Sequence, residues 1–288
     1  MSPPSAPSAP SGPSGASPEA LRDLALAVAR EGAALVRERR SGAVEVAATK
    51  TSDIDVVTEA DRACEALVRE RILAARPEDG FLGEESADDE HAVPADGVRW
   101  IVDPIDGTVN FLYDLDGYSV CVAAEVTVDG TSEVVAGVVV DPATGTEYEA
   151  VLGGGARRDG VPLAVRGPAP LAERLLCTGF SYDRRIRVLQ AEAWVRLLPH
   201  VRDIRRRGSA ALDLCLVAEG RADGYVEEGV HLWDHAAAGL VAREAGASTR
   251  VLPGVGGLDL LVCAPSHGFE ELLDAVEWAG FTGGTAAE

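Results

Sequence analysis

The 288-residue sequence is almost without lysine and is poor in aromatic residues. Lys50 is its single lysine, and aromatic residues make up 5% of the chain. Positive charge is scarce, because 26 lysine and arginine side chains face 47 aspartates and glutamates and the net charge is −21. Such a chain repels phosphate backbones and anionic lipid, so we expect no nucleic-acid partner and no membrane partner. An anionic substrate can bind only at a site where cations or hydrogen-bond donors make the local electrostatic potential positive.

Paired cysteines and long apolar runs are also missing. The five cysteines lie far apart without a C-x-x-C pair, which predicts buried reduced thiols and neither a disulfide framework nor a zinc site. No apolar run approaches the roughly 18 residues that a membrane span needs. Residues 1–17 are all Met, Ser, Pro, Ala or Gly, which is typical of a disordered tail and not of a signal peptide. These features together predict a cytoplasmic protein.

Hydrophobic periodicity predicts a layered α/β architecture. Apolar residues recur at helical spacing over 18–40 and 58–77. The middle of the chain is rich in strand-like runs, with a hairpin turn at Pro142 to Gly145. After about Gly167, short strands alternate with helices. We therefore expect two parts behind the tail, 18–166 and 167–288.

The stretch WIVDPIDGTVNF places two carboxylates directly after an apolar strand. Asp103 ends the strand, Pro104 forces a turn, and Asp106 precedes Gly107 and Thr108. A loop of this kind can direct two carboxylates and a backbone carbonyl at a hard cation, and it leaves N–H groups for a phosphate oxygen. The alternative is plain turn chemistry, in which the aspartates bind their own backbone. The loop alone leaves both interpretations open.

Further acidic residues stand at the ends of other expected elements. Glu84 and Glu85 follow an apolar run and a glycine, Asp234 stands at the mouth of a helix, and Asp61 follows Thr58 by three residues. Asp234 and Asp61 also fit helix capping without any other function. If these groups converge, divalent cations are the natural counter-charge. Oxygen ligands without a His/Cys cluster favour Mg²⁺.

Taken together, these motifs resemble those of the inositol monophosphatase family. The resemblance rests on WIVDPIDGTVNF, on GEES, and on WDHAAAGLVAREAGA, in the family's order and with Lys50 and Asp61 ahead of them. It covers about residues 20–275. It implies a layered α/β/α/β/α sandwich of the inositol monophosphatase and fructose-1,6-bisphosphatase type, and a Mg²⁺-dependent phosphomonoesterase. The resemblance also implies a homodimer.

The same resemblance assigns roles to individual residues. The implied ligands of two or three Mg²⁺ ions are Glu84, Asp103, the backbone carbonyl of Ile105, Asp106 and Asp234. Glu84 and Thr108 match the pair that orients the attacking water, and Asp61 matches the carboxylate that hydrogen-bonds the threonine. Gly107 and Thr108 match the N–H groups that hold the phosphate. Lys50 matches a lysine near the third metal, and Glu85 matches a residue behind the ligands.

The pocket for the alcohol part of the substrate is also implied by the resemblance. Its expected residues are Gly208, Ser209, Ala210 and Glu227, with Asp106 and Asp234 reaching the hydroxyl groups. This set suits a small phosphorylated polyol such as inositol monophosphate. Asp114 and Asp116 depart from the family pattern, in a loop that borders the pocket mouth in relatives, where added charge would narrow the choice of substrate.

Several alternatives stay open at the level of the sequence. Histidinol phosphate, fructose 1,6-bisphosphate and 3′-phosphoadenosine nucleotides are the rival substrates. Arg205 to Arg207 are either a solvated strand face or a contact with substrate or a partner subunit. A regulatory role through a protein partner is the rival from another functional class, and it is compatible with enzymatic activity.

Overall fold

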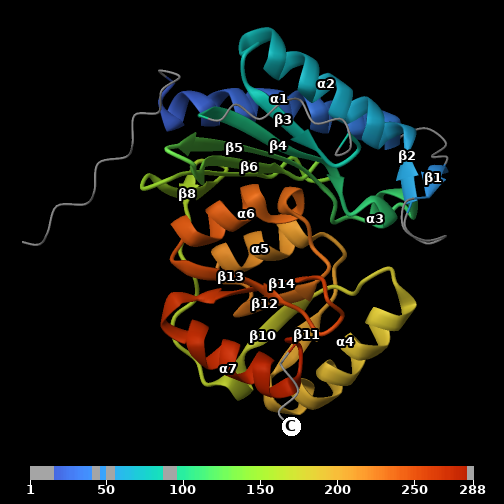
Figure 1. Ribbon diagram of the computed structural model, residues 1–288, viewed down its shortest axis with the longest axis vertical. Coiled ribbons are helices and arrows are strands. Elements are labelled where there is room, and N and C mark those ends of the chain that lie inside the picture. The colour runs from blue at the N-terminus through green and yellow to red at the C-terminus, as the bar shows by residue number, and fades with distance from the viewer. Residues whose placement is uncertain (1–15, 41–45, 50–55, 87–95, 284–288) are drawn as a thin grey trace, which may run out of the picture.

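Helices and sheets alternate in five layers, as Figure 1 shows. The computed structural model describes residues 16–40, 46–49, 56–86 and 96–283. The first layer contains α1 (Pro18–Arg40) and α2 (Glu59–Ala75), which cover one face of a seven-stranded sheet. The other face of that sheet packs on α5 (Ala210–Ala218) and α6 (Leu232–Glu244), which separate it from a five-stranded sheet. The last layer contains α4 (Arg184–Leu197) and α7 (Phe269–Ala279) on the far side of the five-stranded sheet. The expected α/β/α/β/α sandwich is therefore confirmed. The tail over residues 1–15 and Lys50 lie outside the described residues.

The seven-stranded sheet follows chain order from β3 to β9. Its strands are β3 (Gly80–Gly83), β4 (Gly97–Asp106), β5 (Ser119–Val128), β6 (Thr131–Val140), β7 (Glu147–Val151), β8 (Gly155–Arg158) and β9 (Val161–Pro162). β3 pairs with β4 in parallel, and every later neighbour is antiparallel. The predicted turn at Pro142 to Gly145 joins β6 to β7. β1 (Val46–Thr49) and β2 (Val56–Thr58) form a separate antiparallel pair.

The five-stranded sheet is mixed. Its order is β11 (Asp203–Arg205), β10 (Leu175–Thr178), β12 (Gly224–Glu228), β14 (Asp259–Pro265) and β13 (Ala247–Pro253). β10 is parallel to both β11 and β12, so the chain crosses between them through helices. Because α4 and α5 provide these crossovers, the carboxyl ends of β10, β11 and β12 share one edge of the sheet.

The central part of α6 has no exposed side. Residues Ala236 to Ala242 of α6 are all buried, as expected for a helix enclosed between two sheets. Small residues let the layers approach closely: a Cβ added at Gly137 of β6 would lie 2.7 Å from the carbonyl oxygen of Ala237. Since α6 packs against β4 to β8 and also against β13, it ties the two sheets together. The expected division near residue 166 stays a prediction.

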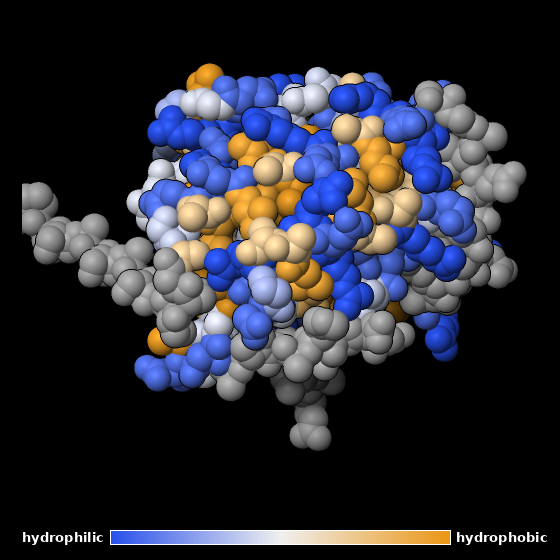
Figure 2. All heavy atoms as spheres, turned by 90° about the horizontal axis from the view of Figure 1, so that it is seen from above, coloured by the Kyte–Doolittle hydropathy of each residue, from blue (hydrophilic) through white to orange (hydrophobic). Residues whose placement is uncertain are grey.

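The cysteines and the described helices test two of the inferences drawn from composition. All five cysteines are buried and free, as predicted. Among the described helices, none is long and apolar enough to cross a membrane. Figure 2 looks down on the layer of α1 and α2, where hydrophobic residues gather near the middle of a largely hydrophilic face. Partly buried leucines of α1, among them Leu24 and Leu35, pack against the core beneath this layer.

Candidate active site

The DPIDGT stretch ends β4 and begins a short helix. The pairing of β4 with β5 shifts register between Asp103 and Asp106, and α3 (Thr108–Leu112) starts directly afterwards. Gly107 has a φ of 97°, and an added Cβ would lie 2.9 Å from the carbonyl oxygen of Gly117. A side chain at position 107 would therefore be both strained and crowded, which explains the glycine.

Asp103 partly satisfies the turn interpretation. Its side chain is buried, and the Ile105 N–H donates to its Oδ1 at 3.0 Å. This is a carboxylate binding its own backbone two residues on. Asp103 also lines a cavity, so turn chemistry holds the loop in shape and still leaves the carboxylate facing an open space.

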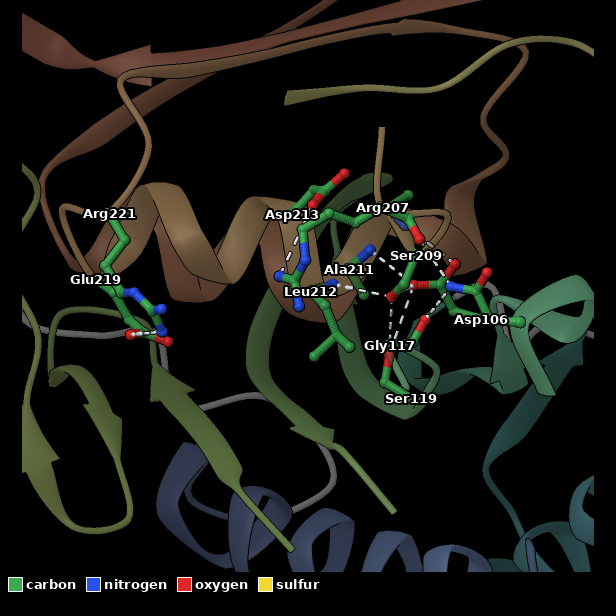
Figure 3. Close-up of polar contacts among 12 residues, drawn as sticks. Asp106, Gly117, Ser119, Arg207, Ser209, Ala211, Leu212, Asp213, Glu219 and Arg221 are labelled. Atoms are coloured by element: carbon green, nitrogen blue, oxygen red, sulfur yellow. Dashed lines mark hydrogen bonds and ion pairs between the residues drawn. The ribbon is translucent and has the colours of Figure 1, made fainter. Parts of the chain in front are cut away.

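Asp106 connects the loop to the start of α5. The Ser209 hydroxyl donates to its Oδ2 at 2.5 Å, the Ala211 N–H donates to the same oxygen at 2.8 Å, and the Ala210 N–H donates to Oδ1 at 3.1 Å. Figure 3 shows Asp106 facing the first turn of α5. Ser209 is also the N-cap of this helix and accepts from the Leu212 N–H at 3.2 Å. Negative charge is favourable at a helix N-terminus, so this contact fixes the two sheets relative to each other at the site.

Asn110 of α3 holds the other side of this junction. Its side-chain amide donates at 2.7 Å to the carbonyl oxygens of both Gly117 and Arg207. Gly208 follows with a φ of 98°, and an added Cβ would lie 3.0 Å from the Asn110 amide nitrogen. The asparagine and the glycine thus fix the path of the chain that leads into α5.

Thr108 and Asp61 form a hydrogen-bonded pair at the edge of the site. The Thr108 hydroxyl lies 3.0 Å from Asp61 Oδ1 and also 3.0 Å from the carbonyl oxygen of Ile105. The other oxygen of Asp61 accepts from the backbone N–H and the hydroxyl of Thr58, in a complete capping box at the start of α2. The capping alternative for Asp61 is therefore correct, and it coexists with the bond to Thr108. Burial raises the pKa of Asp61.

One cavity of about 680 Å³ collects most of the predicted site residues. Glu84 reaches it from the end of β3, and Asp234 reaches it from the first turn of α6. Asp234 is the third residue of α6, and its carboxylate accepts from the N–H of the N-cap His231 at 2.5 Å. The predicted residues that line the cavity are Glu84, Asp103, Ile105, Asp106, Gly107, Thr108, Gly208, Ser209, Ala210, Glu227 and Asp234.

Glu84, Asp103, Asp106 and Asp234, here called the four-carboxylate cluster, repel one another. Burial, reinforced by the negative charges of the other three members, raises the pKa of Asp103 well above its usual range. Burial and the charges of Glu84 and Asp106 do the same to the pKa of Asp234. Burial also raises the pKa of Asp106, while its bonds to Ser209 and α5 oppose that shift.

The four-carboxylate cluster fits a hard divalent cation by its chemistry. Its donors are all carboxylate oxygens, with a nearby backbone carbonyl at Ile105, and a bound cation would offset their mutual repulsion. Among the described residues, no three His, Cys, Asp or Glu side chains are already drawn together as a formed metal site. The bonds of Asp106 to Ser209 and Ala211 turn this carboxylate toward α5.

Another part of the cavity lining, around Glu227 and here called the Glu227 end, contains a carboxylate whose charge is partly compensated. The Tyr225 hydroxyl donates to Glu227 Oε2 at 2.7 Å. Burial raises the pKa of Glu227 to about 7, although this bond and the charge of Arg206 oppose the shift. A Cβ at Gly179 would overlap the Glu227 carboxylate, so the glycine after β10 makes room for it. Arg206 is the single lysine or arginine among the described residues that line the cavity.

Four predicted positions are not in the cavity lining. Asp61 stands behind Thr108, as its hydrogen bond requires. Glu85 lines a separate shallow pocket beside α2, and its N–H donates to Glu65 at 2.7 Å. Neither Asp114 nor Asp116 lines the cavity, and Asp114 forms an ion pair with Arg40, so an effect of their charge on specificity stays a prediction. The pairing draws that loop toward the end of α1.

Sequence reasoning missed several residues of the site. Gly179 and Asp213 line the cavity, and Asp213 is buried on α5. Burial raises the pKa of Asp213 to about 8, although the charge of Arg207 opposes the shift. The spacing from Ser209 to Asp213 is one helical turn, which is the signal that would have indicated a shared face. Nothing local in the sequence distinguishes Arg206 from its two neighbours.

Comparison with known proteins agrees with this geometry. The model of the "Inositol monophosphatase family" matches residues 17–267. The "Inositol-1-monophosphatase SuhB" of Mycobacterium tuberculosis is 45% identical over 282 residues, which cover 90% of this chain and 94% of that protein. The solved structure of "Mycobacterium tuberculosis SuhB" has a TM-score of 0.76 and 41% identity, and the match covers 92% of this chain and 98% of that one.

A further relative has a different name. The "Nus factor SuhB" of Pasteurella multocida is 38% identical over 225 residues, which cover 78% of this chain and 82% of that protein. The fold, the cavity with its four-carboxylate cluster and the match over most of the sequence lead to one conclusion. The chain belongs to the inositol monophosphatase family and is a phosphoric monoester hydrolase.

Proposed function

We propose that the protein is a Mg²⁺-dependent phosphomonoesterase whose substrate is a small phosphorylated polyol, most simply inositol monophosphate. The observation that carries this proposal is the four-carboxylate cluster at one end of a cavity, with the Thr108–Asp61 pair at its edge. A purely structural role does not require four mutually repelling carboxylates around one open space.

The cluster would hold the cation. We assign Glu84, Asp103, Asp106, Asp234 and the carbonyl of Ile105 as its ligands. Mg²⁺, when bound there, would neutralise the phosphate dianion and lower the pKa of the attacking water. Gly107 is the N-cap of α3 and Thr108 is its first residue. N–H groups at this end of a helix have no intrahelical partner, and in this proposal those of Gly107 and Thr108 hold a phosphate oxygen.

Thr108 and Asp61 would manage the proton. The Thr108 hydroxyl is a weak base by itself, so it needs a partner that accepts charge. Asp61 lies 3.0 Å away, and burial raises the pKa of its carboxyl group, which brings that group closer to the range of a useful proton acceptor. Glu84 and Thr108 then orient water for direct attack on phosphorus. This route needs no nucleophilic side chain and no phosphorylated protein.

The Glu227 end would bind the alcohol part. Glu227 accepts from Tyr225 with one oxygen and has further acceptor capacity for substrate hydroxyl groups. Ser209 and Ala210 line the same cavity and donate to Asp106, which fits a role in positioning the ester beside the four-carboxylate cluster. A neutral polyol with adjacent hydroxyl groups matches such a lining better than a flat apolar group does.

The test is phosphate release from a panel of four esters, with Mg²⁺ and with EDTA. The panel contains inositol 1-phosphate, histidinol phosphate, fructose 1,6-bisphosphate and 3′-phosphoadenosine 5′-phosphate. We expect Mg²⁺-dependent turnover that is fastest for inositol 1-phosphate. Preference for histidinol phosphate would keep the chemistry and overturn the assignment of the Glu227 end. Turnover of none of the four would contradict the phosphatase proposal.

A regulatory role with a basic protein partner is a second candidate. It is favoured by the relative named "Nus factor SuhB" and by a net charge of −21, which suits a basic protein surface. The two roles can coexist. An Asp103→Asn variant separates them, because it should lose phosphatase activity and keep any regulatory activity. Loss of both together would argue against an independent regulatory role.

The proposal also covers the cellular location and the oligomeric state. We propose a cytoplasmic homodimer, in which five buried free thiols suit a reducing compartment. Sedimentation of the full chain should give twice the mass of 30.0 kDa. A monomer at micromolar concentration would contradict this part without affecting the chemistry.

A further inference from the structure

Three consecutive arginines lead into α5, and their side chains have different surroundings. Arg205 pairs with Asp203 on the same strand at 2.6 Å. Arg207 lies 4.0 Å from Asp213, the pair that Figure 3 marks with a dashed line. Arg206 belongs to neither pair and lines the cavity instead. The sequence left two alternatives open for the whole run, and of its three arginines only Arg206 lines the cavity.

The Arg206 guanidinium stands close to the seat of the alcohol part. A Cβ at Gly208 would lie 2.8 Å from Arg206 Nη1, so the charge is over the backbone that leads to Ser209 and Ala210. It also opposes the rise in the pKa of Glu227, which indicates that its field reaches that carboxylate. Asp213 and Glu227 face the same space. Arg206 thus supplies the fixed positive charge in an otherwise acidic lining.

We infer that Arg206 sets the charge preference of the alcohol pocket, so that esters with a neutral or anionic alcohol part are accepted and those with a cationic one are rejected. This inference rests on the proposed function and deepens it by naming the class of alcohol. Without the guanidinium, the Glu227 end would attract an ammonium group, because the carboxylates of Asp213 and Glu227 would remain there without its opposing charge. With the guanidinium in place, a cationic alcohol part is repelled, and the space beside Gly208 is occupied by the arginine.

The expected effect is moderate, because Arg206 is exposed at the cavity wall. Two charges several ångströms apart in a partly solvated site change a binding constant by about tenfold. Salt weakens such an effect, since the Debye length falls to about 3 Å at 1 M ionic strength. A steric role of the arginine would show no such dependence on salt.

The test uses three small esters that differ in the charge of the alcohol part: phosphoethanolamine, glycerol 2-phosphate and 3-phosphoglycerate. The measured quantity is kcat/KM with saturating Mg²⁺ for the full chain, with inositol 1-phosphate as the reference substrate. Arg206→Gln should lower the ratio of 3-phosphoglycerate to phosphoethanolamine about tenfold, and Arg206→Lys should largely keep it. In the wild-type protein, high salt should move the same ratio toward that of the glutamine variant.

Arg205→Gln is the matched control, because it removes a neighbouring arginine that does not line the cavity. Its ratio should equal that of the wild type. An unchanged ratio in Arg206→Gln, with inositol 1-phosphate still hydrolysed, would overturn the inference and leave the proposed function intact. Absence of turnover for every ester, the reference included, would contradict the proposed function instead.

Discussion

The two ends of the cavity contain similar carboxylates in opposite surroundings. In the four-carboxylate cluster, burial and like charges both raise the pKa values of Asp103 and Asp234. At the Glu227 end, burial raises the pKa of Glu227, whereas the Tyr225 hydroxyl and the charge of Arg206 oppose that rise. Like charges thus reinforce burial at the first end, whereas neighbouring side chains oppose it at the second. One cavity can therefore combine cation-dependent chemistry with recognition of an uncharged group.

The strongest way to break this contrast is to remove one charge from the four-carboxylate cluster. Asp103→Asn should lower kcat/KM for inositol 1-phosphate by about 10³-fold, because metal binding contributes several kcal/mol and each ~1.4 kcal/mol is tenfold. It should not lower the melting temperature measured in EDTA, since it relieves repulsion. Asp129→Asn, on an exposed turn, is the control and should behave as the wild type. A fully active Asp103→Asn protein would refute the ligand assignment.

A smaller loss is expected beside the cluster. Thr108→Val removes the hydroxyl bonded to Asp61 and should lower kcat about 10²-fold with little change in KM, as is typical when a proton-transfer group is lost. Thr108→Ser keeps the hydroxyl and should recover most of the rate. Equal defects in both variants would point to packing of the methyl group and not to the hydroxyl.

At the Glu227 end the account predicts an effect on binding and not on the chemical step. Gly179→Ala pushes the Glu227 carboxylate from its position and should raise KM for inositol 1-phosphate about tenfold, the value of roughly one charge-assisted hydrogen bond. Gly167→Ala, where an added Cβ meets open space, is the control. A fall in kcat at constant KM would show that Glu227 takes part in the reaction itself.

An effect of a different kind concerns the pH dependence of stability in EDTA. The folded-state pKa of Asp213 is about 8, above its unfolded value, so the folded protein binds the extra proton between pH ~4 and ~8. Stability from this group is therefore present at low pH and is lost as the pH rises toward 8, by at most about 1.4 kcal/mol per pH unit. Asp213→Asn should flatten the decline in denaturant titrations. An unchanged slope would mean that Asp213 is ionised throughout.

Local features of the site could be predicted from sequence because they depend on neighbours along the chain. The DPIDGT loop, the capping box of Thr58 with Asp61, and helix α1 follow from turn chemistry and periodicity. The convergence of Asp103, Asp106, Glu84 and Asp234 was expected mainly through the family resemblance. Periodicity alone does not bring together the ends of β3, β4 and α6.

Contacts between distant segments could not be predicted. The bonds of Asp106 to residues 209–211 join positions more than a hundred apart, and they depend on how α5 sits between the sheets. The same packing decides that Arg206 faces the cavity while Arg205 and Arg207 pair elsewhere. The ion pair of Asp114 with Arg40 likewise joins positions that are remote in sequence. In each case the deciding interaction is tertiary, and the local pattern permits several outcomes.

The most direct test of the central claim is phosphate release from inositol 1-phosphate as a function of free Mg²⁺, starting from protein treated with EDTA. The account predicts no turnover without a divalent cation and a saturable recovery as Mg²⁺ is added, with Asp103→Asn requiring far more Mg²⁺ or failing to recover. Full turnover by the wild-type protein in EDTA would contradict the account.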